Sequence, residues 1–211
     1  MACKAPLDQT IQAMLMRQLY LAHYEQEEFL KALDIAKQMA QLKALPDVCH
    51  QDVARAWIAL NNIDAAVEHL RLAARNAPAR RRSFHLWTLG SVLFLARRFE
   101  DAESVLKRAV RWATTDRPLC AGHLALVQLA RGQQVREIGS IVEQLEHSPC
   151  GQGYGRFVLG MLCVYTQRSV EAERYLTGFI TRTTSGRKAL ALCLAGEVAM
   201  AQEYVRKISS N

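Results

Sequence analysis

The chain has 211 residues and a formal net charge of +7, and half of its residues are apolar, which is enough for one or two packed domains. No apolar run approaches the length of about 18 residues that a transmembrane helix requires, so the sequence predicts no membrane span. Residues 1–9 carry one lysine and no apolar stretch, which argues against a secretory signal. We therefore expect a short lead-in over residues 1–12 and a cytoplasmic protein.

From residue 13 onward the sequence repeats with a period of about 34 residues. Small residues recur at fixed offsets: Ala54, Ala66 and Ala73 return one period later as Gly, Ala and Ala. A further short repeat, or a set of capping helices, is expected over residues 187–211. The five complete copies are expected over residues 13–46, 47–80, 83–116, 118–151 and 153–186.

Each copy reads as a pair of helices. Apolar residues recur at steps of three and four, which is helical spacing, and no segment alternates apolar and polar residues over the length of a strand. Helix breakers separate the periodic segments, at Pro46, Pro78, Pro118 and Pro149. Because one helical hairpin cannot bury its apolar faces alone, neighbouring hairpins are expected to stack.

The repeat resembles the tetratricopeptide repeat family over nearly the whole chain. Residues 47–80 match the family motif best, at Ala54, Trp57, Ala66, Leu70, Ala73 and Pro78, with Leu70 large but not aromatic. The fourth copy departs from the motif at Glu137, so a looser hairpin is expected there. The resemblance implies an all-α fold, a right-handed α-solenoid of stacked antiparallel helical hairpins with at least ten helices and no strands. It implies no specific chemistry.

The resemblance also implies where a partner would bind, because in this family the first helix of each hairpin lines a concave groove. The Lys/Asn/Arg clamp of chaperone-binding members is absent, and the only cationic groove residues are Arg17 and Arg55. We expect a partly exposed apolar strip that binds a peptide or an amphipathic helix. The alternative is that these aromatic residues pack against the sixth unit or a dimer mate. The expected groove residues are Arg17, Arg55, Phe84, Trp87, Phe94, Leu126, Tyr154, Phe157, Met161 and Tyr165.

Positive charge is concentrated between Arg80 and Arg117, where nine basic residues face four acidic ones. A convex basic patch could meet an acidic protein, an anionic lipid or a nucleic acid, or could simply be a solvated face. Nucleic acid is the less favoured ligand, because repeat proteins that read RNA need polar side chains on each unit, and Phe94, Leu126 and Met161 are apolar. The candidate patch comprises Arg80, Arg81, Arg82, Arg97, Arg98, Lys107, Arg108 and Arg111.

The six cysteines and six histidines form no recognisable metal or catalytic motif. Cys49, His85 and Cys120 occupy equivalent places in successive first helices, but packed helices are about 10 Å apart. A zinc ion needs its ligand atoms within about 2.3 Å. Cys163 and Cys193 fall in apolar segments and are expected to be small buried hydrophobic residues. The histidines lie in different repeats without a nearby nucleophile motif, so we expect no enzyme, no metal and no cofactor.

Three functions remain open from the sequence. The leading one is a scaffold or adaptor that binds a peptide or an amphipathic helix of another protein, and a homo-oligomer is compatible with it. The second is a chaperone for a secreted or aggregation-prone client. The third is a binder of nucleic acid or of an anionic surface through the basic patch, which salt would weaken steeply.

Overall fold

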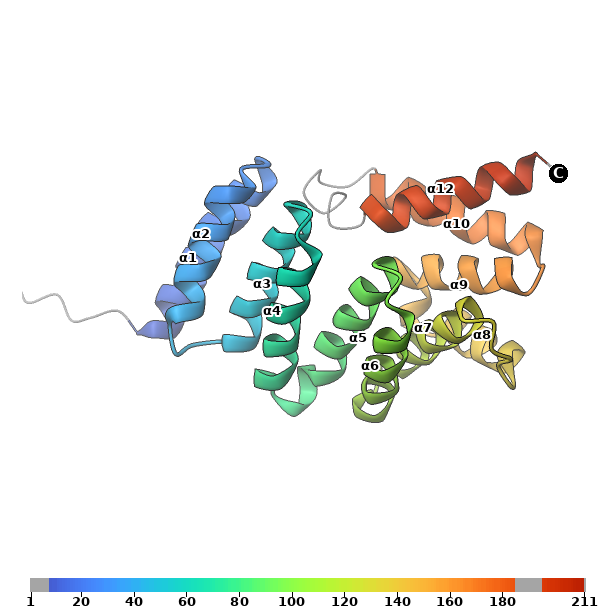
Figure 1. The fold of residues 1–211 in the computed structure, drawn as a ribbon, viewed down its shortest axis with the longest axis horizontal. Coiled ribbons are helices and arrows are strands. Elements are labelled where there is room, and N and C mark those ends of the chain that lie inside the picture. Colours follow the sequence, from blue (N-terminus) through green and yellow to red (C-terminus); the bar gives the residue numbers. More distant parts are fainter. Residues whose placement is uncertain (1–7, 185–194, 211) are drawn as a thin grey trace, which may run out of the picture. The chain divides into compact units, whose positions relative to one another are not determined.

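The computed structural model of the chain describes residues 8–184 and 195–210. Within these residues there are eleven α-helices, one short 3-10 helix and no β-strand (Figure 1). Consecutive helices pair as antiparallel hairpins, and the hairpins of each unit stack on their neighbours. The prediction of an all-α fold built from stacked helical hairpins is confirmed.

The chain divides into two compact units, Met1–Ala77 and Pro78–Asn211. Two hairpins form unit 1: α1 (Gln9–Glu25) with α2 (Phe29–Gln41), and α3 (Pro46–Ala59) with α4 (Ile63–Asn76). These hairpins cover the first two expected repeats. Their core is made of small and apolar side chains, including Ala32, Ala36, Met39, Val53, Ala54, Ala66 and Leu70.

Unit 2 contains the remaining helices. Among its described residues the last element is α12, and residues 187–194 of the expected sixth repeat lie outside the described part of the chain. Among the described α-helices, α8 is the shortest, with nine residues, and it belongs to the repeat that departs from the motif at Glu137. The elements are α5 (Ala79–Leu95), α6 (Phe99–Trp112), α7 (Arg117–Ala130), α8 (Ile138–Glu146), the 3-10 helix η1 (Pro149–Gly151), α9 (Tyr154–Tyr165), α10 (Ser169–Thr184) and α12 (Ala195–Ser209).

The turn inside each of the five hairpins has the same backbone geometry, including in the repeats whose sequences match the motif least. One residue adopts a left-handed conformation with φ between 58° and 74°. The N–H of the next residue then donates to a carbonyl five residues earlier, as in Arg98 to Leu93 (2.9 Å) and Arg168 to Cys163 (2.9 Å). This arrangement is a Schellman cap, which satisfies carbonyl groups at the helix end. The left-handed residues are Glu27, Asn61, Arg97, Gly132 and Gln167.

Only one of these five turns has the residue that suits it best, so the others store conformational strain. A side chain in the left-handed region costs about 1–2 kcal/mol, whereas glycine avoids that cost and loses about 0.5–1 kcal/mol through unfolded-state entropy. We therefore expect Gln167→Gly to raise the free energy of unfolding by roughly 0.5–1 kcal/mol, measured by urea denaturation.

The matched control is Gly132→Ala, at the equivalent turn of the fourth repeat. Gly132 has φ +74°, and a Cβ atom added there would meet nothing within 4 Å, so the alanine causes no clash and only the backbone penalty remains. We expect this variant to lose about 1 kcal/mol. Equal effects of the two substitutions would mean that the turns are not strained.

A membrane crossing requires a helix of about 20 largely apolar residues. None of the helices within residues 8–184 and 195–210 is both long enough and apolar enough to span a bilayer.

Candidate functional site

In unit 1, α1 and α3 bring two arginines onto one buried carboxylate. Arg17 Nε lies 2.5 Å from Asp52 Oδ2, and Arg55 Nη1 lies 3.5 Å from Asp52 Oδ1. The Asp52 side chain is fully buried, whereas 36% of the Arg17 side chain and 24% of the Arg55 side chain remain exposed. We call these three residues the arginine pair site. It carries two positive charges and one negative charge.

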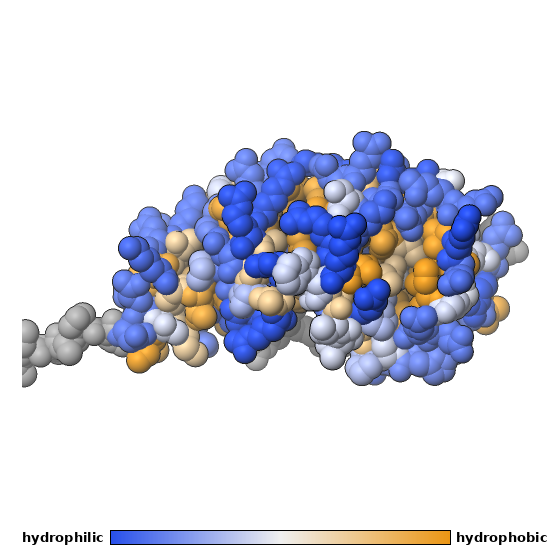
Figure 2. Space-filling model, turned by 90° about the horizontal axis from the view of Figure 1, so that it is seen from below, coloured by the Kyte–Doolittle hydropathy of each residue, from blue (hydrophilic) through white to orange (hydrophobic). Residues whose placement is uncertain are grey.

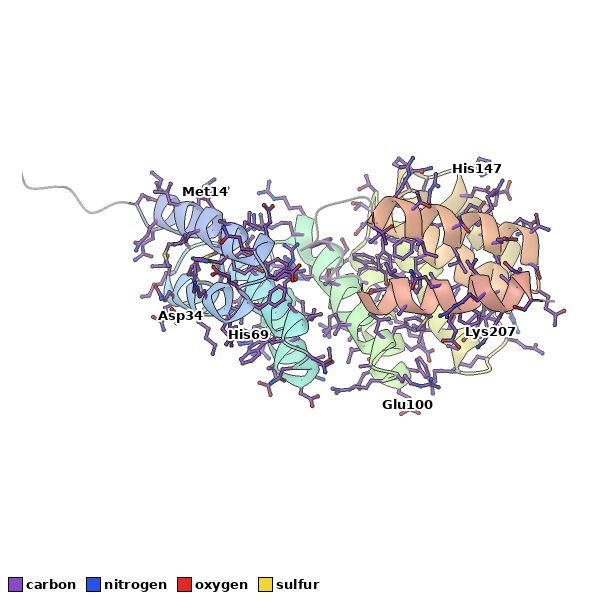
Figure 3. The ribbon with its side chains drawn as sticks, turned by 90° about the horizontal axis from the view of Figure 1, so that it is seen from above. Met14, Asp34, His69, Glu100, His147 and Lys207 are labelled. Atoms are coloured by element: carbon purple, nitrogen blue, oxygen red, sulfur yellow. The ribbon has the colours of Figure 1, made fainter. Side chains whose placement is uncertain are left out.

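Neighbouring contacts hold the arginine pair site in place. Tyr20 donates from its hydroxyl to the Asp52 backbone carbonyl at 3.1 Å, which ties α1 to α3. The Arg55 guanidinium lies 5.8 Å from the centre of the Tyr24 ring. The hydrogen bond to Asp52 raises the pKa of Arg17 above its ordinary value, so this guanidinium stays charged. The labelled Met14, one turn earlier on α1, is exposed (Figure 3).

In unit 2, side chains from three first helices converge with one from α12. The Ser91 hydroxyl of α5 lies 2.6 Å from the Tyr154 hydroxyl of α9. Each hydroxyl also lies within hydrogen-bonding distance of Glu197 Oε1 of α12, at 3.4 Å from Ser91 and 3.2 Å from Tyr154. Trp87 packs edge-on against Tyr154, with ring centres 4.9 Å apart, and His123 of α7 lies 5.9 Å from Tyr154. We call these five residues the Glu197 cluster.

Burial governs the protonation of the Glu197 cluster. Desolvation raises the pKa of Glu197 to about 7 and lowers the pKa of His123 to about 3, so the imidazole is neutral. The pKa of Tyr154 is raised well above 10, chiefly by desolvation and then by Glu197. Four buried polar atoms find no hydrogen-bond partner among the described residues: Trp87 Nε1, Glu197 Oε2 and both ring nitrogens of His123. Such orphaned groups are costly and call for an explanation.

The expected exposed aromatic strip does not exist as a whole. Phe94, Leu126, Phe157 and Met161 are each at most 3% exposed, so the prediction that they line an open groove is wrong. They face their packing partners instead: the ring centre of Phe157 lies 5.4 Å from that of Phe179 of α10. Helical periodicity alone does not distinguish a groove face from a face that packs on the next helix.

The other expected strip residues keep some exposure. Phe84 is 48% exposed and Tyr165 is 39% exposed, while Trp87 and Tyr154 are half-buried. The alternative that these aromatic residues pack against the C-terminal helix agrees with Tyr154, which bonds to Glu197. On the face shown in Figure 2, hydrophilic side chains interrupt the apolar areas.

The eight expected basic residues do not form one continuous patch. Arg82 lies 4.4 Å from the centre of the Trp112 ring, so residues 80–82 at the start of α5 lie beside the end of α6. Arg97 and Arg98 lie at the opposite end of this hairpin, and α5 with its 17 residues is about 25 Å long. Arg98 pairs with Asp101 at 2.8 Å and Lys107 with Glu103 at 2.7 Å. Positive charge is therefore divided and partly neutralised.

Three of the four cysteines in the described part of the chain are buried, and the fourth, Cys150, is half-buried. Cys49, Cys120 and Cys163 are buried, and desolvation raises the pKa of Cys49 to about 11 and the pKa of Cys120 to about 12. These thiols are therefore protonated near neutral pH and poor nucleophiles. Cys193 lies outside the described residues. No group of three potential ligands that could hold a metal ion occurs within residues 8–184 and 195–210.

Three residues of these sites were not expected from the sequence: Asp52, His123 and Glu197. The sequence does contain a pattern that could have identified Asp52 and His123. Each directly precedes the repeated apolar position of its first helix, at Val53 and Leu124, so a polar residue recurs at one offset inside an apolar segment. Glu197 had no such signal, because its repeat is incomplete.

No protein-family model matches the chain, and no curated protein matches it. Several solved structures do match the chain. PilF of Pseudomonas aeruginosa is 18% identical, with a TM-score of 0.58, covering 95% of this chain and 90% of that one. A putative kinesin light chain from Podospora anserina, described as having nearly identical TPR-like repeats, is 15% identical, with a TM-score of 0.53, covering 97% of this chain and 96% of that one. The chain therefore has the fold of proteins built from tetratricopeptide-like repeats.

Proposed function

We propose that the chain is a protein-interaction scaffold and that the arginine pair site binds a carboxylate of its partner. The observation that carries this proposal is the convergence of Arg17 and Arg55 on one fully buried carboxylate. Asp52 contacts both guanidinium groups and so orients them. Both arginine side chains remain partly exposed on the first-helix face of unit 1.

The chemistry of guanidinium suits this role. Its planar fork of N–H donors matches a carboxylate in two parallel hydrogen bonds, and such charge-assisted bonds are about twice as strong as neutral ones. A fork that is already held by packing loses less side-chain entropy on binding. The class of partner segment that fits is a peptide with an acidic side chain or a free C-terminus, lying along α1 and α3 with apolar contact near Met14.

The two other candidate functions have weaker support. The division of the basic residues between the two ends of the α5–α6 hairpin counts against a nucleic-acid groove, which needs a continuous basic track. A general chaperone role would need a broad apolar surface, and four of the expected groove residues are buried. We therefore retain the scaffold as the proposed function.

The test uses a pooled, fluorescein-labelled peptide library in two forms, one with a free C-terminal carboxylate and one amidated. We expect the full-length chain to retain peptides of the free-acid pool, and amidation to weaken the selected peptides at least tenfold in fluorescence anisotropy. Arg17→Gln should cause a similar loss. Arg17→Lys should give an intermediate value, because lysine keeps the charge but lacks the fork.

The matched control is Arg75→Gln, which removes an exposed arginine on α4 of the same unit. It should leave peptide binding unchanged. Equal binding of the acid and amide pools, or retention of affinity by a folded Arg17→Gln variant, would contradict the proposed site.

A further inference from the structure

The helix α1 has an apolar face that the described part of the chain leaves open. Ile11 is 50% exposed, Leu15 59% and Leu19 52%, and Met14 beside them is 57% exposed. These are four of the nine large apolar side chains that the described residues expose. Single exposed apolar residues are ordinary, whereas several gathered on one helix mark an interaction surface.

Ile11, Leu15 and Leu19 form one ridge along α1, which we call the α1 ridge. They are spaced four residues apart, and residues at this spacing lie one above another on a helix. The ridge is therefore about 12 Å long. All three side chains are aliphatic, so the ridge presents neither a charge nor a hydrogen-bonding group. What covers it must be apolar as well.

The α1 ridge lies on the opposite side of α1 from the arginine pair site. Residues two apart on a helix, such as Leu15 and Arg17, point about 160° away from each other. Arg17 and Tyr20 contact Asp52 of α3, and Tyr20 and Tyr24 are buried, so the ridge is directed away from this core. The helix is thus apolar on two sides, which is typical of a helix that is covered on both.

The scarcity of charge on α1 suits contact between two copies of the chain. Its charged residues are Arg17 and Glu25, and its His23 pairs with Glu28 at 2.5 Å, whereas the shorter α6 has six charged side chains. The centre of an interface is depleted of charge, and like charges placed opposite each other oppose association. Arg17 is held by Asp52 on the far side of the helix, so two ridges can meet without repulsion between charges of their own.

We infer that the chain self-associates through the α1 ridge, as a two-fold dimer in which the two α1 helices run antiparallel with Leu15 at the axis. In this dimer Ile11 of each copy contacts Leu19 of the other. Such an interface must complement itself, and a ridge with a leucine at its centre and an aliphatic residue of similar size at each end does so. Ridges with a spacing of four residues interdigitate when their helices cross at about 50°.

The dimer goes beyond the proposed function, because it needs no carboxylate ligand and leaves the arginine pair site open. The extent of the ridge sets its strength. Three large side chains, each at least half exposed, offer roughly 300 Å² of apolar area per copy. A standard interface buries about 800 Å² per partner, and smaller ones are typical of reversible association. We therefore expect a dimer that forms and dissociates in the micromolar range.

Sedimentation velocity of the full-length chain across the micromolar range tests the inference. The sedimentation coefficient should rise with concentration from the value of one copy towards that of two. Leu15→Glu would place two carboxylates against each other at the axis, so it should weaken association at least a hundredfold. The matched control is Val170→Glu on α10, which replaces an apolar residue that is 80% exposed in unit 2. This variant should dimerise like the unaltered chain.

A mixture of two variants tests the antiparallel arrangement. Ile11→Lys and Leu19→Glu should each be monomeric alone, because each would bury a charge against an aliphatic side chain. Mixed in equal amounts, with a fluorophore on one of them, they should form a heterodimer. There the introduced lysine of one chain meets the introduced glutamate of the other, while the remaining isoleucine and leucine stay in contact.

A chain that stays monomeric throughout, or a dimer that Leu15→Glu does not weaken, would overturn the inference, and so would a mixture that fails to associate. Circular dichroism checks that each variant is folded, and the mixture decides should Leu15→Glu not fold. Arg17→Gln should dimerise like the unaltered chain, and Leu15→Glu should still bind the free-acid peptides. Failure of the dimer and failure of the proposed carboxylate site are therefore separate results.

Discussion

Replacing Gly90 with leucine is expected to lower the free energy of unfolding by about 3 kcal/mol, because the second helix of its hairpin occupies the space that a side chain would need. A Cβ atom at Gly90 would lie 2.6 Å from Leu106 Cγ and 2.7 Å from Leu106 Cδ2. Such distances are far inside van der Waals contact, and Leu106 is itself fully buried. The α5–α6 hairpin would have to open to admit the new side chain.

Urea denaturation followed by circular dichroism measures this loss. The matched control is Gly139→Leu in α8, where a Cβ atom would meet nothing within 4 Å. Leucine is the better helix former by up to about 1 kcal/mol, so the control should be neutral or stabilising. If Gly90→Leu cost no more than Gly139→Leu, the close approach of α5 to α6 would be wrong.

The close contact between α5 and α6 could be predicted from the sequence because small residues recur at fixed positions of the repeat. A small residue at one offset of each first helix indicates a backbone that comes close to its hairpin partner. Gly160 confirms the rule two repeats later, since a Cβ atom there would lie 2.5 Å from Leu176 Cδ2. The fold and the positions of close packing thus follow from periodicity, which reflects contacts between neighbouring repeats.

The candidate sites could be predicted only in part. The frame assigned Arg17 and Arg55 to the same surface, and the structure brings them together at Asp52. It also assigned Phe94 and Phe157 to an open strip, although both are buried. First helices are apolar on more than one side because they contact both their own partner and the next repeat. Periodicity identifies apolar faces, but which face stays open depends on what packs against it.

Glu103 is a charged residue whose burial the sequence pattern does not reveal. It lies on α6 among Glu100, Asp101 and Lys107, a charged segment from which the sequence predicts an exposed side chain. In the structure Glu103 is only 5% exposed. Its Oε1 accepts from Lys107 Nζ at 2.7 Å and Gln128 Nε2 at 3.4 Å, and its Oε2 accepts from Arg131 and from Gln133 Nε2 at 3.3 Å. The carboxylate therefore connects α6 to the end of α7.

Glu103→Gln is expected to lower the free energy of unfolding by about 2 kcal/mol at pH 7, since hydrogen bonds to a charged group contribute about 1.5–3 kcal/mol. The glutamine amide would also direct its N–H donors at either Lys107 or Arg131, because only one of its two terminal atoms is an acceptor. Glu100→Gln is the matched control on the same helix. Glu100 projects away from the molecule (Figure 3), with 87% of its side chain exposed, and its pair with Arg131 should matter by less than about 0.5 kcal/mol.

The contribution of Glu103 to the free energy of unfolding should be lost at acid pH, over a range set by its pKa. The hydrogen bond from Lys107, followed by those from Arg131 and Gln128, lowers the pKa of Glu103 from 4.5 to about 2. A carboxylate with a depressed pKa stabilises the folded state above its unfolded pKa, and this contribution is lost as pH falls through the folded value. The stability difference between the unaltered chain and Glu103→Gln should therefore be full at pH 7 and decline between about 4.5 and 2. Urea midpoints at pH 7, 4 and 3 measure the decline, and a difference that stays constant over this range would show that the Glu103 contacts are not formed in solution.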